Sequence, residues 1–387
     1  MEHVKNRVMI FSAQWPGFAR SGLGVMALLH ARFLVELGFN VCAVGTDSSV
    51  EEFTGELDSV YQVMCKGSGA LYSPEKTDEN KICHIINSEN PDIIIVEAWQ
   101  NSLAHSVLKL ACDFKIPVIV ISHGVNLFPA TFRILNIIRS LCWMPYLFSR
   151  LPKLIKKARL VSSLSLTSSD LRFLDRRIAE KLNVDVYKLA NCAFNHRLEK
   201  RLTFSERKKQ VILIGYFGEV KNQIAAIKMM AGISGIALRL VGNKDGSYFK
   251  KCRNLVEKLK ISDRVYFSND KEIDLPLEIA SSLALISTSS TEALPVSVLE
   301  AIAVGTPFVS YRNGCINEIE GGITVSKNNP KVLSRELSSI IADEMLWNRV
   351  SDAGYKFYGR SFSREIIKNQ FRVIVETALN ERTKNGR

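Results

Sequence analysis

Short apolar runs alternate with amphipathic segments along this chain of 387 residues, and a polar, basic stretch divides the alternation into two series. Such alternation is typical of a parallel β-sheet covered by helices. In the first series we predict a helix over 25–37, where apolar residues recur at helical spacing and Gly38 follows. Strands are expected at 7–12, 41–45, 92–97, 118–122 and 164–167.

The dividing stretch contains few apolar side chains, and we predict a linker over 196–210. The alternation then resumes, and the last segment, 364–381, again has apolar residues at helical spacing. The sequence therefore predicts an α/β protein with a Rossmann-like domain over 1–195 and a second one over 211–363. The strands of the second domain are expected at 211–215, 237–242, 265–268, 284–288 and 307–311.

The net charge of +12 indicates an anionic partner, which could be a nucleotide phosphate, a nucleic acid or a membrane lipid. No nucleic-acid-binding module accompanies the charge, so we expect no nucleic acid partner. Eight dispersed cysteines, none in a CxxC pair, fit buried side chains in a reducing compartment better than a zinc site. With no signal peptide and no apolar run of about 18–20 residues, we expect a cytoplasmic protein, or one attached to a membrane surface.

The most informative segment runs from Ser289 to Pro307. Pro295 suits the first turn of a helix and Gly305 suits its end, so Glu292 is expected in the preceding loop and Glu300 in the second turn. The start of a helix that follows a strand binds anions readily. Two glutamates eight positions apart also occur in ordinary amphipathic helices, so the inference rests on the whole string.

That string, Ser289-x-x-Glu292-x7-Glu300-Ala-x-Ala-x-Gly305-x-Pro307, resembles the signature of the family-4 glycosyltransferases. The resemblance implies the GT-B fold, in which two Rossmann-like domains with parallel sheets face a central cleft and the final helix, here 364–387, crosses back to the first domain. The resemblance also implies site roles. Glu292 would lie beside the transferred sugar, Glu300 would bind the ribose, and three loop backbones would bind the sugar and diphosphate: Ala293, Leu294 and Val296.

A second element, residues 215–222, is expected to follow a strand and to open a helix. It resembles the family's loop whose lysine neutralises the donor diphosphate, which assigns that role to Lys221. Tyr216 departs from the pattern, because many family members carry a phosphate-binding arginine there.

A glycine-rich loop over 20–24 is expected before the first helix. It resembles the phosphate-binding loop of the related glycogen synthases, which assigns donor binding to Arg20, Gly22 and Gly24. The same glycines, with Asp47, also match a dinucleotide fingerprint. About ten residues separate the first strand from Gly22, which favours the transferase interpretation over NAD binding.

His123 follows an apolar strand, and ligands bind at the carboxyl ends of such strands. It resembles the family residue near the hydroxyls of the donor sugar, and we assign it a catalytic role with Glu292. No Asp-x-Asp string and no P-loop string occur in the chain. These absences give no support to a metal-dependent GT-A site, and the family resemblance implies no cofactor and no metal: a nucleoside-diphosphate sugar would be the co-substrate, and Lys221 and Arg20 would do the work of the cation.

Residues 114–169 contain eight lysines and arginines and no acidic residue, with aromatic and aliphatic side chains between them. This composition suits an anionic membrane surface, contacted through 128–160, but also a helix that packs its apolar face in the core.

The predicted function is transfer of a sugar from a nucleoside-diphosphate sugar to a glycan or lipid-linked acceptor, with retention of configuration. We expect a role in surface polysaccharide or glycolipid biosynthesis. Two alternatives stay open: a nucleotide-sugar epimerase or hydrolase of the same fold, and a GT-B scaffold without catalytic activity.

Overall fold

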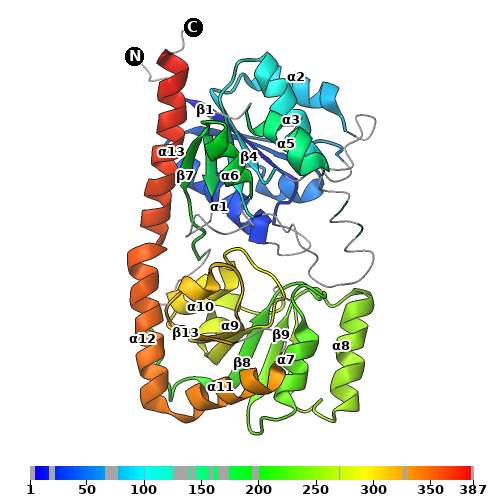
Figure 1. Cartoon of the computed structure of the whole chain (residues 1–387), viewed down its shortest axis with the longest axis vertical. Coiled ribbons are helices and arrows are strands. Elements are labelled where there is room, and N and C mark those ends of the chain that lie inside the picture. Colours follow the sequence, from blue (N-terminus) through cyan, green and yellow to red (C-terminus); the bar gives the residue numbers. More distant parts are fainter. Residues whose placement is uncertain are drawn as a thin grey trace. The chain divides into compact units, whose positions relative to one another are not determined.

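The computed structural model describes residues 5–16, 22–65, 77–99, 101–124, 138, 141, 145–156, 160–163, 174–193, 200–269, 271–325 and 329–384. The chain divides into two compact units (Figure 1). The first unit comprises Met1–Ala190 and Ile367–Arg387, and the second comprises Asn191–Ile366. Each is described by itself.

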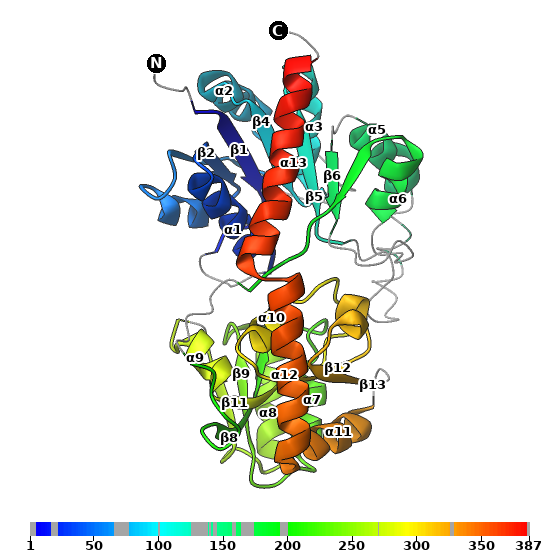
Figure 2. The ribbon, with the colours of Figure 1, turned by 90° about the vertical axis from the view of Figure 1, so that its left-hand side faces the viewer.

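The first unit is built on a seven-stranded sheet in the order β3-β2-β1-β4-β5-β6-β7, and every neighbouring pair is parallel. Helices pack against this sheet (Figure 2). The strands are β1 (Arg7–Ser12), β2 (Asn40–Gly45), β3 (Ser59–Gln62), β4 (Ile93–Glu97), β5 (Val118–Ser122), β6 (Leu160–Ser163) and β7 (Asp185–Lys188). The helical segments are α1 (Gly22–Glu36), η1 (Ser48–Phe53), α2 (Glu79–Glu89), α3 (Ser102–Asp113), η4 (Tyr146–Arg150), α5 (Leu151–Ile155), α6 (Leu174–Lys181) and α13 (Arg364–Lys384), whose residues from Ile367 onward belong here.

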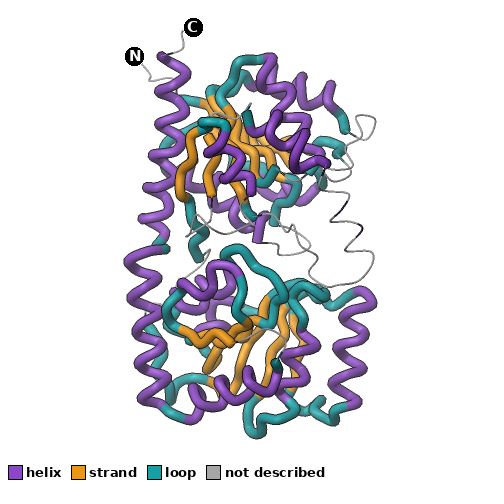
Figure 3. The backbone as a smooth tube through the Cα atoms, viewed as in Figure 1, coloured by secondary structure: helices purple, strands orange, loops and turns teal. Residues whose placement is uncertain are grey.

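The second unit has a six-stranded parallel sheet in the order β10-β9-β8-β11-β12-β13. Figure 3 shows its strands in orange and the helices around them in purple. Its strands are β8 (Lys208–Ile214), β9 (Ala237–Val241), β10 (Val265–Ser268), β11 (Ser282–Ser287), β12 (Phe308–Tyr311) and β13 (Gly322–Val325). Its helical segments are α7 (Gln223–Met230), α8 (Gly246–Lys258), α9 (Leu275–Ala280), α10 (Val296–Ala303), η6 (Gly314–Glu318), α11 (Pro330–Ala342) and α12 (Glu344–Ser361).

The predicted α/β class with two Rossmann-like halves is confirmed, and the strands expected from apolar runs are present within a few residues. The exception is the strand expected at 164–167, which lies outside the described residues. The sequence did not reveal β3, β6, β7 and β13, which are four residues long each. Of these, β3, β7 and β13 lie at sheet edges with largely half-buried or exposed side chains, so they lack the apolar run that marks a central strand.

The predicted linker over 196–210 needs a correction at its end, because β8 begins at Lys208. Lys208 and Lys209 are exposed, but two polar side chains beside them are buried and hydrogen-bonded. Gln210 donates to Oε1 of Glu278 at 2.8 Å. Arg207 is also buried, donating to the backbone oxygens of Ser282 and Gly305. A hydrogen-bonded polar residue can lie inside a fold, so low apolar content did not mark a loop here.

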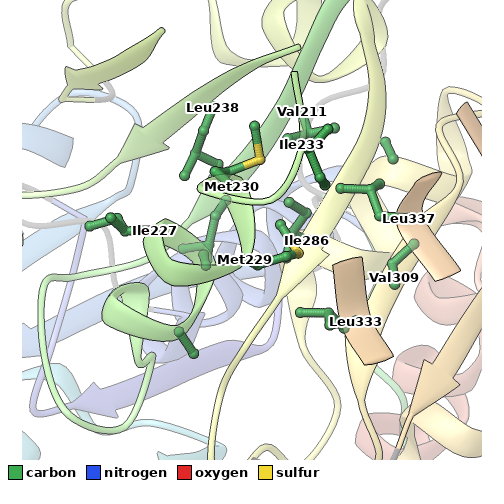
Figure 4. Close-up of a cluster of buried hydrophobic side chains, with 14 of the residues drawn as sticks. Val211, Ile227, Met229, Met230, Ile233, Leu238, Ile286, Val309, Leu333 and Leu337 are labelled. Atoms are coloured by element: carbon green, nitrogen blue, oxygen red, sulfur yellow. The ribbon is translucent and has the colours of Figure 1, made fainter. Parts of the chain in front are cut away.

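In the second unit, strands β8, β9, β11 and β12 pack their apolar side chains against α7 and α11 (Figure 4). This buried cluster includes Val211, Ile227, Met229, Met230, Ile233, Leu238, Ile286, Val309, Leu333 and Leu337. A close-packed layer of this kind fixes the strand ends from which the candidate site loops emerge. Among the helices that the structure describes, none is long and apolar enough to cross a bilayer.

Candidate functional site

The loop between β11 and α10 carries the most informative sequence motif. As predicted, Glu292 lies in the loop, Glu300 lies in the second turn of α10, and Gly305 follows the end of the helix. Pro295, expected in the first turn, is instead the residue immediately before the helix. The loop starts at the carboxyl end of β11, a central strand of the sheet. Ligands of open α/β sheets bind at such strand ends.

Lys221, in the loop between β8 and α7, meets Glu292 in this place. Its Nζ lies 2.5 Å from Oε1 of Glu292, and both side chains are largely buried. The aliphatic part of Lys221 passes over Gly215, where an added Cβ would lie 3.1 Å from three of its carbon atoms. A glycine at this position therefore leaves the space that the lysine occupies on its way to Glu292.

Backbone hydrogen bonds hold the two loops together. The N–H of Ser290 donates to the carbonyl of Val220 at 2.7 Å. The Thr288 hydroxyl contacts the carbonyls of Lys221 at 3.0 Å and Asn222 at 2.9 Å. The positions of Lys221 and Glu292 are thus set by bonds on both sides of the ion pair, which suits a preorganised charge arrangement.

The chain after β12 supports the same loop from its other side. Gly314, at φ +56°, approaches the carbonyl oxygens of Glu292 and Ala293 so closely that an added Cβ would lie 2.2 and 2.7 Å from them. The N–H of Cys315 donates to the Ala293 carbonyl at 2.9 Å, and Nδ2 of Asn313 donates to the Ser289 carbonyl at 2.8 Å. These contacts give a structural reason for the Asn-Gly pair in the sequence.

Glu300 is buried on α10. Burial raises the pKa of Cys192 to about 12, and the Glu300 charge adds to that rise. The loop before α10 is held by a hydrogen bond from a distant part of the chain: Nδ2 of Asn191 donates to the Leu294 carbonyl at 2.9 Å. Val296 is the first residue of α10.

Tyr216 stands in the β8–α7 loop, where many family members are expected to carry arginine, and its side chain is half-exposed. Partial burial raises the pKa of the Tyr216 phenol, with the Lys221 charge lowering it and the Glu292 charge raising it. The phenol therefore lies within electrostatic reach of the ion pair and is neutral at physiological pH.

The glycine-rich segment lies partly outside the description, because Arg20 is not among the described residues. Gly22 and Gly24 are described, and here the expectation of a loop is corrected. Helix α1 begins at Gly22 rather than at Val25, so both glycines form its first turn. Because glycine has no apolar side chain, Gly22 and Gly24 did not contribute to the helical spacing of apolar residues, although Gly24 is buried.

In the first unit, His123 directly follows β5, as predicted, and its Nε2 lies 2.6 Å from Oε2 of Glu97. The other oxygen of Glu97 lies 2.6 Å from Nδ1 of His30 on α1. Burial would raise the pKa of Glu97, but the two imidazoles outweigh it and hold this pKa low, at about 2. The carboxylate is therefore ionised throughout the neutral range.

The sequence did not single out Glu97 or His30. Glu97 is the sole charged residue of β4, whose other residues are isoleucine and valine, and His30 lies in a buried run of α1. A buried charge at a strand end, and a histidine among apolar helix residues, were the available signals. The contact between His30 and Glu97, 67 positions apart, could not be predicted from the sequence, because it depends on the order of the strands in the sheet.

Within the described ranges, no group of three or more metal-binding side chains is present.

Of the basic stretch 128–160, the structure describes Ile138, Leu141, 145–156 and Leu160. Leu151, Leu154 and Ile155 pack into the core of the first unit, so these three side chains are not available to a membrane. Phe148 is exposed, as are Arg150, Lys153 and Lys156.

Residues 195–357 match the sequence profile of the family "Glycosyl transferases group 1". The lipopolysaccharide core biosynthesis glycosyltransferase LpsE of Rhizobium meliloti is 30% identical over 165 residues, which are 42% of this chain and 48% of LpsE. The chain thus spans about half the length of this relative.

Solved structures extend the comparison to nearly the whole fold. A sucrose-phosphate synthase from Thermosynechococcus elongatus has a TM-score of 0.77 at 17% identity, covering 97% of this chain and all of that one. HepE from Anabaena, in complex with UDP-glucose, has a TM-score of 0.73 at 14% identity, covering 96% and 99%. These similarities confirm the GT-B fold expected from the sequence.

Proposed function

We propose that this chain, whose residues 195–357 match the profile of the glycosyl transferases group 1 family, transfers a sugar from a nucleoside-diphosphate sugar to a glycan or lipid-linked acceptor. The observation that carries the proposal is the ion pair between Lys221 and Glu292, held between two strand-end loops. LpsE, named for lipopolysaccharide core biosynthesis, supports a role in surface polysaccharide or glycolipid synthesis.

In this proposal Lys221 binds the donor diphosphate. A departing nucleoside diphosphate accumulates negative charge, and a cation fixed in advance stabilises it without reorganisation. The N–H groups at the start of α10, at Val296 and in the loop residues Ala293 and Leu294, would add donors for the phosphates and the sugar. Arg20, Gly22 and Gly24 would complete the donor site, and no metal ion is needed in this scheme.

Glu292 and His123 are the proposed catalytic residues. Glu292 would contact the hydroxyls of the transferred sugar while its charge stays balanced by Lys221. Glu300 would bind the ribose of the nucleotide, and His123 would contact the donor sugar. In this proposal the acceptor attacks the sugar on the face from which the diphosphate departs, which retains the configuration. Glu292 then positions the sugar and stabilises its developing charge, and it forms no covalent bond to the sugar.

A thermal-shift screen against uridine, guanosine and adenosine diphosphates and their sugars tests donor binding. A product assay with and without an acceptor then separates the alternatives. Donor cleavage or isomerisation without acceptor would assign the chain to the epimerase or hydrolase class. If no nucleoside diphosphate raised the melting temperature, the non-catalytic scaffold would be favoured instead.

We further propose that the protein works at an anionic membrane surface on the cytoplasmic side. The exposed ring of Phe148 lies within eight positions of three exposed cations, Arg150, Lys153 and Lys156. An apolar ring with cations around it suits acidic lipid headgroups. Liposome flotation tests this: we expect binding to anionic but not neutral vesicles, weakened in Phe148→Ser. Met345→Ser, which removes an exposed apolar side chain of the second unit, is the matched control.

A further inference from the structure

Three side chains form a hydrogen-bonded row in the first unit: His30, Glu97 and His123. The two contacts to the Glu97 oxygens are each 2.6 Å long, from Nδ1 of His30 and Nε2 of His123. Glu97 and His30 are fully buried, whereas 13% of the His123 side chain is exposed. Apolar packing would fill this space at less cost than a buried charge, so the row points to a role other than stability.

The buried end of the row fixes the proton of His30. Nε2 of this imidazole is buried and has no hydrogen-bond partner among the described residues, and the Phe371 ring of α13 stacks on the imidazole at 4.7 Å. A buried N–H without an acceptor costs more than an unused lone pair. A neutral His30 therefore carries its single proton on Nδ1 and donates it to Glu97.

The middle of the row is an ionised carboxylate that accepts on both oxygens. Because Oε1 accepts from His30, Oε2 is the oxygen that accepts from His123, and the proton of a neutral His123 must lie on Nε2. This leaves Nδ1 of His123 as the nitrogen that can accept a hydrogen bond from a ligand.

The backbone beside the row adopts an uncommon conformation. Ala98, the residue after Glu97, has φ +65°, a region that residues with a Cβ rarely occupy. Its N–H donates to the carbonyl of Ile121 at 3.0 Å, which ties the end of β4 to β5 close to His123. Disfavoured backbone of this kind gathers at functional sites, where it holds side chains in place.

We propose that Glu97 is a positioning residue for His123. Together with His30 it keeps the His123 proton on Nε2, so that Nδ1 accepts a hydrogen bond from a hydroxyl of the bound sugar. The tautomer assignment stands on the geometry of the row, and its consequence for catalysis rests on the proposed function.

Long-range proton–nitrogen spectra of the full chain, labelled in its six histidines, report the tautomer directly. In the wild-type protein we expect a neutral His123 protonated on Nε2. A glutamine at position 97 offers one acceptor oxygen and one donor NH₂, so it cannot accept from both imidazoles. In Glu97→Gln we therefore expect a mixed or reversed tautomer at His123, with kcat lowered about ten- to a hundred-fold and KM for the donor changed less.

Glu89→Gln is the matched control. Glu89 also accepts two hydrogen bonds, from the Tyr61 hydroxyl at 2.5 Å and from Nη1 of Arg7 at 2.9 Å. Arg7 begins β1, so this group lies at the amino end of the sheet. We expect Glu89→Gln to leave the His123 tautomer and kcat at wild-type values.

A second pair keeps the test open if Glu97→Gln does not fold. His30→Gln retains a donor to Glu97, and we expect near wild-type His123 signals and kcat. His30→Phe retains the stacking on Phe371 but removes the donor, and we expect the His123 signals to shift and kcat to fall several-fold. Equal effects of these two variants would contradict the assignment.

Two further outcomes are decisive. An unchanged His123 tautomer in folded Glu97→Gln would overturn the positioning role. If instead the wild-type chain transferred no sugar while the tautomer still depended on Glu97, the row would be supported and the proposed function would fail by itself.

Discussion

The ammonium group of Lys221 lies 2.5 Å from a carboxylate oxygen of Glu292, although 71 positions separate the two residues. The pair connects the loop after β8 with the loop after β11, and these strands are neighbours in the sheet. Parallel strands bring their carboxyl ends to one edge, so distant loops can share a site. A lysine that is paired before the donor arrives is held in place, which favours electrostatic catalysis.

Replacing Lys221 with alanine should remove the cation that stabilises the departing diphosphate. We expect kcat of Lys221→Ala to fall about a hundred- to a thousand-fold, the range found when one stabilising group of a transition state is removed. Steady-state kinetics measure the change. Lys244→Ala is the control, because Lys244 forms an equally short pair with Glu272 on the exposed surface of the same unit and should leave kcat unchanged. Full activity in Lys221→Ala would refute the site.

Glu292→Gln should lower turnover strongly while leaving the protein folded, since the amide keeps the size of the side chain but loses its charge.

Because Lys221 and Glu292 are in contact, the effects of replacing each of them on the free energy of unfolding should not add. We expect a coupling of about 0.5–3 kcal/mol from urea unfolding of both single variants and the double variant. Additive changes would show that the ion pair does not contribute to folding.

Tyr216→Arg should strengthen nucleoside diphosphate binding. The phenol is half-exposed and lies within electrostatic reach of Lys221, so a guanidinium there would add a second positive charge near the phosphates. Calorimetry at two salt concentrations should give a dissociation constant several-fold lower than wild type, with a steeper salt dependence. Tyr266→Arg adds the same charge at an equally exposed tyrosine of β10 and should change the affinity little. Equal gains in both variants would mean that net charge alone explains the effect.

The central strands could be predicted from the sequence because burial on both faces demands an unbroken apolar run, as in the Ile-Ile-Ile-Val of β4. The edge strands β3, β7 and β13 could not, because half of the surroundings of such a strand is solvent, whereas the edge strand β10 lies where it was predicted, at Val265–Ser268. The site divides in the same way. Lys221 and Glu292 lie in local motifs, whereas Glu97 and His30 become partners only when β4 and α1 are brought together.

Acid should destabilise the protein partly through Glu97. The pKa of this carboxyl is about 2 in the fold, below its ordinary value of 4.5, so the unfolded chain takes up a proton more readily. The stabilisation is therefore complete above about pH 4.5 and is lost as the pH falls towards 2. The contribution of Glu97 to the free energy of unfolding that is lost over this pH range is about 3 kcal/mol at most.

Chemical denaturation over this pH range measures the effect. The titratable groups that face Glu97 are His30 from α1 and His123 from the end of β5. In Glu97→Gln the fall in unfolding free energy between about pH 4.5 and 2 should be smaller than in the wild type. The same slope in both proteins would mean that other carboxyls account for the acid sensitivity.

Gly314→Ala should disturb the catalytic loop through a single methyl group. The glycine has φ +56°, and a Cβ there would lie 2.2 Å from the carbonyl oxygen of Glu292, so the loop must move and the bond from the Cys315 N–H to Ala293 weakens. We expect a loss of about 1–3 kcal/mol in unfolding free energy and a fall in kcat, because Glu292 shifts away from Lys221. Gly235→Ala separates the two causes. Gly235 has φ +70° in the same unit, but a Cβ there meets no atom within 4 Å, so this variant bears the backbone penalty without the collision. Comparable kcat losses in the two variants would show that the contact between Gly314 and the Glu292 backbone does not position the loop.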